Sequence, residues 1–255
     1  MTPTSSGADL VAYTHYLADD ALVLAQRLGE WAANAPEFEE DVALSNIGLD
    51  LLGQARALLT YAGEVEGAGR DEDALAYLRQ EAELRNCLLV EQPNGDFAVT
   101  IARQLLFSGY QLGLYRALAG SADPTLAAVA GKAVKEVDYH LDHAAGWVIR
   151  LGDGTERSHA RMQRALDALW PYTGELFEAD DVVRGLVAEG VAVDPAGLRA
   201  GWDGELDPVL AEATLTRPDP GWQHSGGRRG VHTEHMGYLL AEMQYLHRLH
   251  PGVRW

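Results

Sequence analysis

One stretch, residues 131–152, constrains the fold more than any other part of the chain. Its sequence, GKAVKEVDYHLDHAAGWVIRLG, places four apolar residues at helical spacing: Val134, Val137, Leu141 and Val148. This period predicts a long helix with one buried stripe. Similar periods recur along the chain, long β-branched alternation is absent, and Ala, Leu, Glu and Arg dominate. We therefore predict an all-α protein.

The apolar periods and the capping residues together predict where each helix begins and ends. The main helices are expected over about 9–34, 37–63, 71–90, 96–118, 123–152, 155–170 and 233–249, with shorter ones between 173 and 216. Asn94 is the expected cap of the helix near 96, and Asp123 followed by Pro124 is a start signal for the long helix. Residues 1–8 are expected to form a loose tail. Because no long linker is visible, we expect a single helical domain over residues 1–255.

Charge and composition exclude several classes of function. The formal net charge of −18 argues against binding nucleic acid, whose phosphates would be repelled. A single cysteine, Cys87, excludes an internal disulfide and a cysteine-ligated iron–sulfur cluster. The N-terminal residues lack the pattern of a signal peptide, and no apolar run is long enough to span a bilayer. These features predict a cytoplasmic protein.

The long helix carries one candidate metal site. Glu136, His140 and His143 are spaced by four and then three residues, which places them on one helix face. A carboxylate and two imidazoles on an inward face could hold a metal in a helical bundle. This hypothesis would make the chain a metal-binding oxygenase of the di-iron type, or a ferritin-like protein. The alternative, which we favour, is that the three residues make hydrogen bonds inside the bundle or at an interface.

A di-iron bundle would need Glu-x-x-His pairs on its long helices. The pair occurs once, at Glu156 and His159, where it follows a turn and lies at a helix start. In the long helix, Tyr139 stands three residues after Glu136, where histidine would be required. We therefore predict that this chain has no metal ligand set and no catalytic residue.

A second candidate lies in the glycine-containing run GGRRGVHTEH, residues 226–235. Arg228 and Arg229 could bind a phosphate or a carboxylate in forked geometry, as in a coenzyme A ester. The run also contains further possible metal or partner contacts: His232, Glu234 and His235. The alternative is a loop that leads into a helix and packs on a partner chain.

Five long blocks of sequence carry a family resemblance, in order along the chain. They are IGLDLLGQAR (47–56), LLVEQPNGDFAVTIARQ (88–104), VDYHLDHAAGWVIRLGDGT (137–155), LWPYTGELF (169–177) and GVHTEHMGYLLAEMQYLHR (230–248). Together they resemble the C subunits of bacterial phenylacetyl-CoA epoxidases, from about residue 21 to residue 255. The resemblance implies a ferritin-like bundle with additional C-terminal helices.

The resemblance also implies a role in a multicomponent oxygenase of aerobic phenylacetate breakdown. In that family an A subunit holds the di-iron centre and forms a complex with the C subunit. A B subunit and a reductase with FAD and an iron–sulfur cluster complete the assembly, which converts phenylacetyl-CoA into its ring epoxide with O₂ and NADPH. In that family the C subunit is structural and non-catalytic, a degenerate relative of the catalytic chain that stabilises it, and the resemblance implies the same role here. Block by block, Leu51 and Gln54 stand where that chain would have Glu and His, so no cofactor is expected here.

Overall fold

A computed structural model describes residues 7–253 of the chain. Over this range the chain forms α-helices and short 3-10 helices and no strand, which confirms the predicted all-α class. The α-helices are α1 Gly7–Gly29, α2 Phe38–Glu66, α3 Glu72–Tyr77, α4 Phe97–Leu118, α5 Pro124–Gly152, α6 Glu156–Leu169, α7 Asp181–Ala188, α8 Arg199–Glu212 and α9 His235–Leu249. No helix in this range has the length and apolar character needed to cross a membrane.

The chain divides into two compact units. Unit 1 combines the residues up to Pro93 with those from Gly226 onward, and unit 2 runs from Asn94 to Ser225. The expectation of one domain over residues 1–255 stays a prediction. Of the expected tail, residues 1–6 lie outside the described range, whereas residues 7 and 8 already belong to α1.

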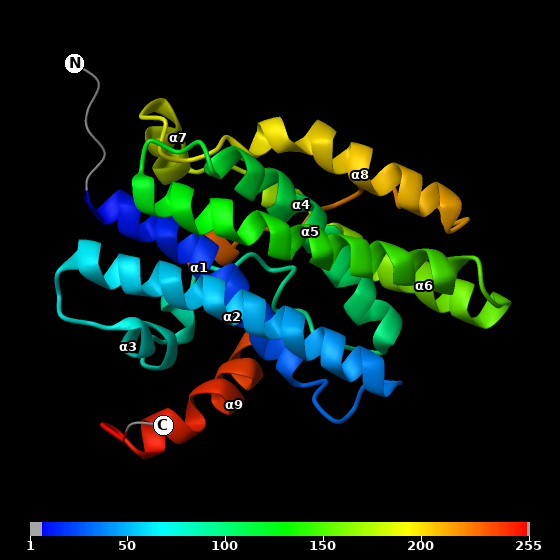
Figure 1. The fold of residues 1–255 in the computed structure, drawn as a ribbon, viewed down its shortest axis with the longest axis horizontal. Helices are drawn as coiled ribbons and strands as arrows, with labels where there is room; N and C mark the ends of the chain where they lie inside the picture. The colour runs from blue at the N-terminus through cyan, green and yellow to red at the C-terminus, as the bar shows by residue number, and fades with distance from the viewer. Residues whose placement is uncertain (1–6, 254–255) are drawn as a thin grey trace. The chain divides into compact units, whose positions relative to one another are not determined.

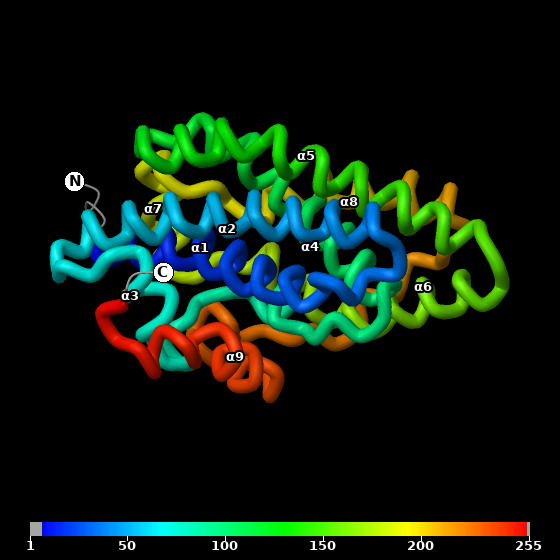
Figure 2. Tube along the Cα trace, turned by 60° about the horizontal axis from the view of Figure 1, so that its bottom comes forward, coloured from blue at the N-terminus to red at the C-terminus, as the bar shows by residue number. Residues whose placement is uncertain are grey.

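Unit 1 is built on α1 and α2, which lie side by side and run in opposite directions (Figures 1 and 2). Gly48 of α2 lies against α1, since a Cβ at this position would stand 3.5 Å from Cβ of Leu28, in ordinary van der Waals contact. The inner face of α2 is fully apolar at its centre, where Leu44, Ile47 and Leu51 have no exposed surface. Helices α3 and α9 complete this unit and contact each other.

Unit 2 is organised around α4, which contacts α5, α6 and α8. Most of α4 is buried around its whole circumference, as expected for a central helix. Two large side chains fix α8 in this unit: the rings of Trp170 and Trp202 have centroids 5.5 Å apart, and Trp202 Nε1 donates to the carbonyl of Leu106 at 2.9 Å. Helices α4, α5 and α8 of this unit are labelled in Figure 1.

Most predicted helix boundaries agree with the structure to within a few residues. Asp123 caps α5 by accepting from the amides of Thr125 and Leu126, and Pro124 is the first helical residue, as predicted. The cap of α4 is Asp96 instead of Asn94. Asn94 uses its side-chain oxygen to accept from Arg103 at 2.6 Å.

One predicted helix is wrong. The segment expected to be helical over 71–90 is helical only in α3, and it then continues through a 3-10 turn at 81–83 into an irregular stretch. Leu84 and residues 86–92 of this stretch are buried. A buried irregular backbone needs hydrogen-bond partners from outside the segment. Charged side chains supply them in this chain, as described below.

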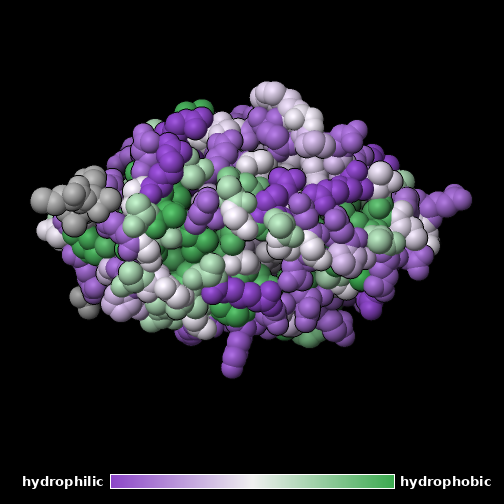
Figure 3. Space-filling view, turned by 90° about the horizontal axis from the view of Figure 1, so that it is seen from above, coloured by the Kyte–Doolittle hydropathy of each residue, from purple (hydrophilic) through white to green (hydrophobic). Residues whose placement is uncertain are grey.

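The surface carries both hydrophobic and hydrophilic side chains. On the face drawn in Figure 3, hydrophobic residues gather toward the left of the view, and hydrophilic side chains cover most of the right. Several large apolar side chains in unit 1 are exposed as well, and two of them stand out: Phe38 is 78 % exposed and Tyr238 is 77 % exposed.

Candidate functional site

Of the two arginines predicted to bind an anion, Arg228 is already bound within unit 1. Arg228 donates from both terminal nitrogens to the carboxylate of Asp20, at 3.0 and 2.7 Å. It also donates to the carbonyl of Tyr16 at 2.9 Å and to that of Arg85 at 2.8 Å. The forked geometry expected from the sequence is therefore present, but its carboxylate comes from α1.

The neighbouring histidine is held in a similar way. Nδ1 of His232 lies 2.7 Å from a carboxylate oxygen of Glu91, and its Nε2 lies 3.2 Å from the carbonyl of Leu84. The other oxygen of Glu91 accepts from the amide and the hydroxyl of Thr233, at 2.6 and 2.8 Å. The side chains of both His232 and Glu91 are fully buried.

A third ion pair lies beside these contacts. Arg79 donates to both carboxylate oxygens of Asp19, with 2.9 Å between its Nη1 and Oδ2. Asp19 also accepts from the amide of Arg85 at 2.8 Å. The two charged side chains have 2 % and 0 % of their surface exposed, so this pair lies in the interior of unit 1.

We call these residues the buried ionic cluster: Asp19, Asp20, Arg27, Arg79, Glu91, Arg228 and His232. The cluster satisfies the backbone of the irregular segment near 84–92. Asp20 accepts from the amide of Cys87 at 2.7 Å, and Arg27 donates to the carbonyl of Glu91 at 2.7 and 3.1 Å. Because unpaired buried backbone groups are costly, the charges allow a segment without secondary structure to be part of the interior.

Burial and pairing shift two pKa values in this cluster. Burial raises the pKa of Asp20 above its usual value, although Arg228 and the amide of Cys87 act in the opposite direction. For His232, burial alone would lower the pKa. The hydrogen bond and the charge of Glu91, with the Leu84 carbonyl, outweigh that effect and raise the pKa of His232 above its usual value.

The remaining candidates of the C-terminal loop are at the surface. Arg229 and Glu234 are exposed, and His235 is partly exposed, with its Nε2 3.9 Å from a carboxylate oxygen of Glu234. The structure thus separates the candidates into two groups. Arg228 and His232 hold the loop in place, whereas Arg229, Glu234 and His235 can reach a partner, and their binding role stays a prediction.

On α5, the sequence candidates are not assembled into a metal site. His140 is buried, whereas Glu136 and His143 are half-buried, and Tyr139 packs near both imidazoles with ring centroids 6.3 and 6.2 Å away. Among residues 7–253, no three side chains of His, Cys, Asp or Glu gather closely enough to hold a metal ion. Glu136, His140 and His143 therefore do not form such a group in this structure.

The residues that the family resemblance places at the positions of a di-iron ligand set do not fit iron. Leu51 is fully buried and has no donor atom, and the buried Gln54 offers an amide where an imidazole would be needed. Tyr139 is 49 % exposed. The single Glu-x-x-His pair has a local role, because Nδ1 of His159 donates to the carbonyl of Gly152 at 2.8 Å and closes the turn before α6.

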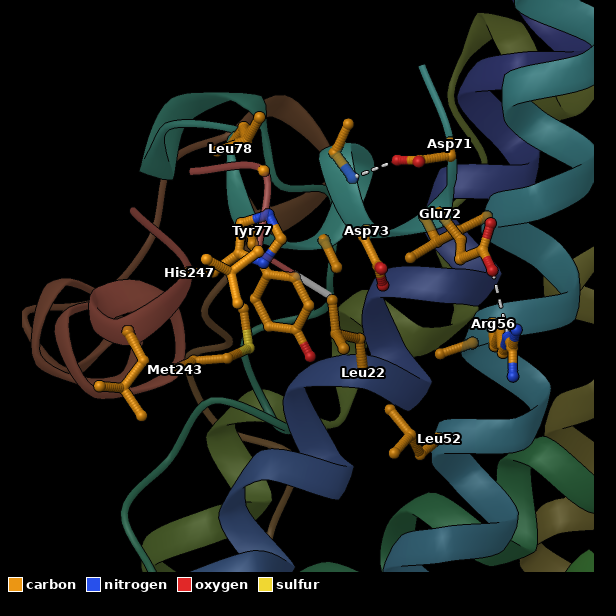
Figure 4. A pocket seen from close by; sticks show the side chains of 17 residues that line it. Leu22, Leu52, Arg56, Asp71, Glu72, Asp73, Tyr77, Leu78, Met243 and His247 are labelled. Atoms are coloured by element: carbon orange, nitrogen blue, oxygen red, sulfur yellow. Dashed lines mark hydrogen bonds and ion pairs between the residues drawn. The ribbon is translucent and has the colours of Figure 1, made fainter. Parts of the chain in front are cut away.

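Unit 1 also contains an open hollow of about 940 Å³, drawn in Figure 4. Its lining includes Leu52 from α2, Tyr77 from α3 and Met243 from α9. Tyr77 stacks on His247 with ring centroids 4.9 Å apart, and Arg56 at the rim is paired with Glu72 at 3.1 Å. Acidic residues 71–73 line the same rim, so the hollow disfavours a phosphate-bearing ligand such as a coenzyme A ester.

Sequence reasoning missed Asp19, Asp20, Arg79 and Glu91, which carry most of the buried charge. For Asp19 and Asp20, the sequence did contain a sign of burial. Asp19 and Asp20 interrupt the apolar run LADDALVLA of α1, and Asp20 falls on the same face as Leu17 and Leu24. A charge inside an apolar stripe indicates a buried partner of opposite charge.

Fold and site together define the class of the protein: an all-α bundle protein whose long helices lack iron ligands at the expected positions. A family model described as phenylacetic acid catabolic protein matches residues 1–255, and the chain belongs to this family. The match confirms the predicted ferritin-like class. The chain is similar to the C subunit of the 1,2-phenylacetyl-CoA epoxidase of Escherichia coli (strain K12), with 54 % identity over 96 % of this chain and 99 % of that protein.

Proposed function

We propose that this chain is the structural, non-catalytic C subunit of a multicomponent phenylacetyl-CoA epoxidase. The observation that carries the proposal is the 54 % identity, over nearly the full length of both chains, to the C subunit of that enzyme in Escherichia coli. The side chains at Leu51, Gln54 and Tyr139 support the non-catalytic part, because they cannot supply the carboxylate and imidazole donors of a di-iron centre.

In this proposal the chain contributes a folded surface and no reacting group. A catalytic A subunit holds the di-iron centre, and the chain stabilises it while phenylacetyl-CoA is converted to its ring epoxide with O₂ and NADPH. A B subunit and a reductase with FAD and an iron–sulfur cluster complete the assembly. The buried ionic cluster supports a structural role, because its charges bind one another and the backbone.

Reconstitution tests this function. We expect the chain to co-elute with the catalytic subunit of the same organism in size-exclusion chromatography with light scattering. With the B subunit and the reductase added, NADPH oxidation that depends on phenylacetyl-CoA should require both chains. Turnover by this chain without the catalytic subunit would contradict the proposal, and so would separate elution of the two chains.

A further inference from the structure

Helix α2 has apolar side chains on two different faces. Its inner face packs on α1 and includes Leu44, Ile47 and Leu51. A second set points away from this interior and consists of Phe38, Val42, Leu49 and Leu52. Spacings of four, seven and three residues place the second set in one line along the helix. We call this second set the outer α2 stripe.

The outer α2 stripe is open to contact along its length. Phe38, Val42, Leu49 and Leu52 are 78, 45, 63 and 42 % exposed. Ser45 and Gly53 lie on the same side of the helix, and nothing stands within 4 Å of the position that a Cβ on Gly53 would occupy. At 1.5 Å per residue the stripe is about 21 Å long, which is the scale of a helix–helix contact. Leu52 also lines the hollow of Figure 4, so the apolar surface continues there.

Isolated exposed apolar residues are normal, but an aligned set of large ones indicates a surface that another chain covers. The charges around the stripe indicate which kind of chain. Between residues 28 and 55 the sequence has six acidic residues and no Lys, Arg or His. Glu39 and Asp50 lie on one side of the stripe and Asp41 on the other.

This charge pattern favours one of two possible partners for the outer α2 stripe over the other. A second copy of the chain would bring acidic flanks against acidic flanks, and like charges brought together at an interface are unfavourable. A helix whose own apolar stripe is flanked by Lys and Arg would match both the shape and the charge. The net charge of −18 adds to the preference for a basic partner surface.

We propose that the outer α2 stripe is the docking surface for a partner chain of different sequence, which presents an apolar helix face flanked by basic residues. The proposal rests on the proposed function, since a structural subunit must bury part of its surface against the catalytic chain. It goes further by naming the residues that are buried and the charge of the surface that covers them.

The test compares Leu49→Glu with Tyr245→Glu. Both residues are exposed, at 63 and 61 %, but Tyr245 lies on α9, outside the stripe. Affinity for the recombinant catalytic subunit is measured by calorimetry at low and high salt, after circular dichroism has shown that both variants are folded. We expect Leu49→Glu to weaken binding at least about tenfold, and Tyr245→Glu to leave it within about threefold. Glu39→Lys should weaken binding mainly at low salt.

Each outcome decides between the two proposals. If the wild-type chain binds and Leu49→Glu binds equally well, the docking surface is wrong and the proposed function stands. Loss of binding in Tyr245→Glu alone would place the interface on α9 and would also overturn the stripe. If instead the wild-type chain forms a homodimer that Leu49→Glu dissolves, the partner chemistry is wrong. Failure of the wild-type chain to bind at all would overturn the proposed function itself.

Discussion

Replacing Arg228 by alanine is expected to lower the free energy of unfolding by about 3–5 kcal/mol, because it leaves one partner of a buried ion pair alone. Asp20 has only 4 % of its side chain exposed, and it would lose both hydrogen bonds from the guanidinium. The carbonyls of Tyr16 and Arg85 would lose a donor as well. Few surface substitutions have effects of this size.

Arg229 provides the matched control, because it is the next residue in the same loop and is exposed. Arg229→Ala should change the free energy of unfolding by no more than about 0.5 kcal/mol. Arg228→Lys should fall between the two, since an ammonium group cannot reproduce the forked contact. Urea unfolding monitored by circular dichroism measures all three variants. Equal stability of the Arg228→Ala and Arg229→Ala variants would contradict the role assigned to the pair.

Acid is expected to destabilise the protein through His15, which lies on α1 and is 9 % exposed. Burial lowers the pKa of His15 to about 4, with Arg79 and Arg70 adding to the effect and Asp19 and Glu66 opposing it. The unfolded chain keeps the ordinary value of 6.5. Between these values the unfolded state binds the extra proton, so stability is complete above pH 6.5 and falls as the pH falls.

The difference in stability between the wild-type chain and a His15→Gln variant isolates this effect, since other titrations cancel. From pH 7 to pH 5 the wild-type chain should lose about 2 kcal/mol relative to the variant. Chemical denaturation at several pH values gives these differences. A constant difference between the wild-type chain and His15→Gln would show that His15 titrates normally in the folded state.

Sequence periodicity predicted the helices well where one face is apolar and the caps are strong. Asp123 with Pro124 defines the start of α5, and the structure agrees. The prediction failed at the segment 84–92, because a buried apolar run looks the same whether its backbone is helical or is satisfied by side chains from elsewhere. Its partners, Asp19 and Asp20 on one side and Arg228 on the other, are more than 60 residues away along the chain.

The sequence likewise predicted only part of the candidate site. The sequence indicated that Arg228 can bind a carboxylate in forked geometry. The residues next to Arg228 in the sequence do not show that this carboxylate is that of Asp20. The lack of a metal ligand is easier to predict from the sequence than a contact is. A leucine at position 51 has no donor atom whatever surrounds it. Exposure cannot be read from spacing either. Leu49 and Leu51 are alike in the sequence, yet one is 63 % exposed and the other is fully buried.

The central claim is that this chain supports a catalyst without being one, and its metal content tests that claim most directly. The chain is purified alone from cells grown with ample iron and manganese and is examined by elemental analysis, beside a Glu136→Gln variant. We expect far less than one metal ion per chain in both samples. One or two ions per wild-type chain, lost in the Glu136→Gln variant, would contradict the claim and identify the α5 face as a metal site.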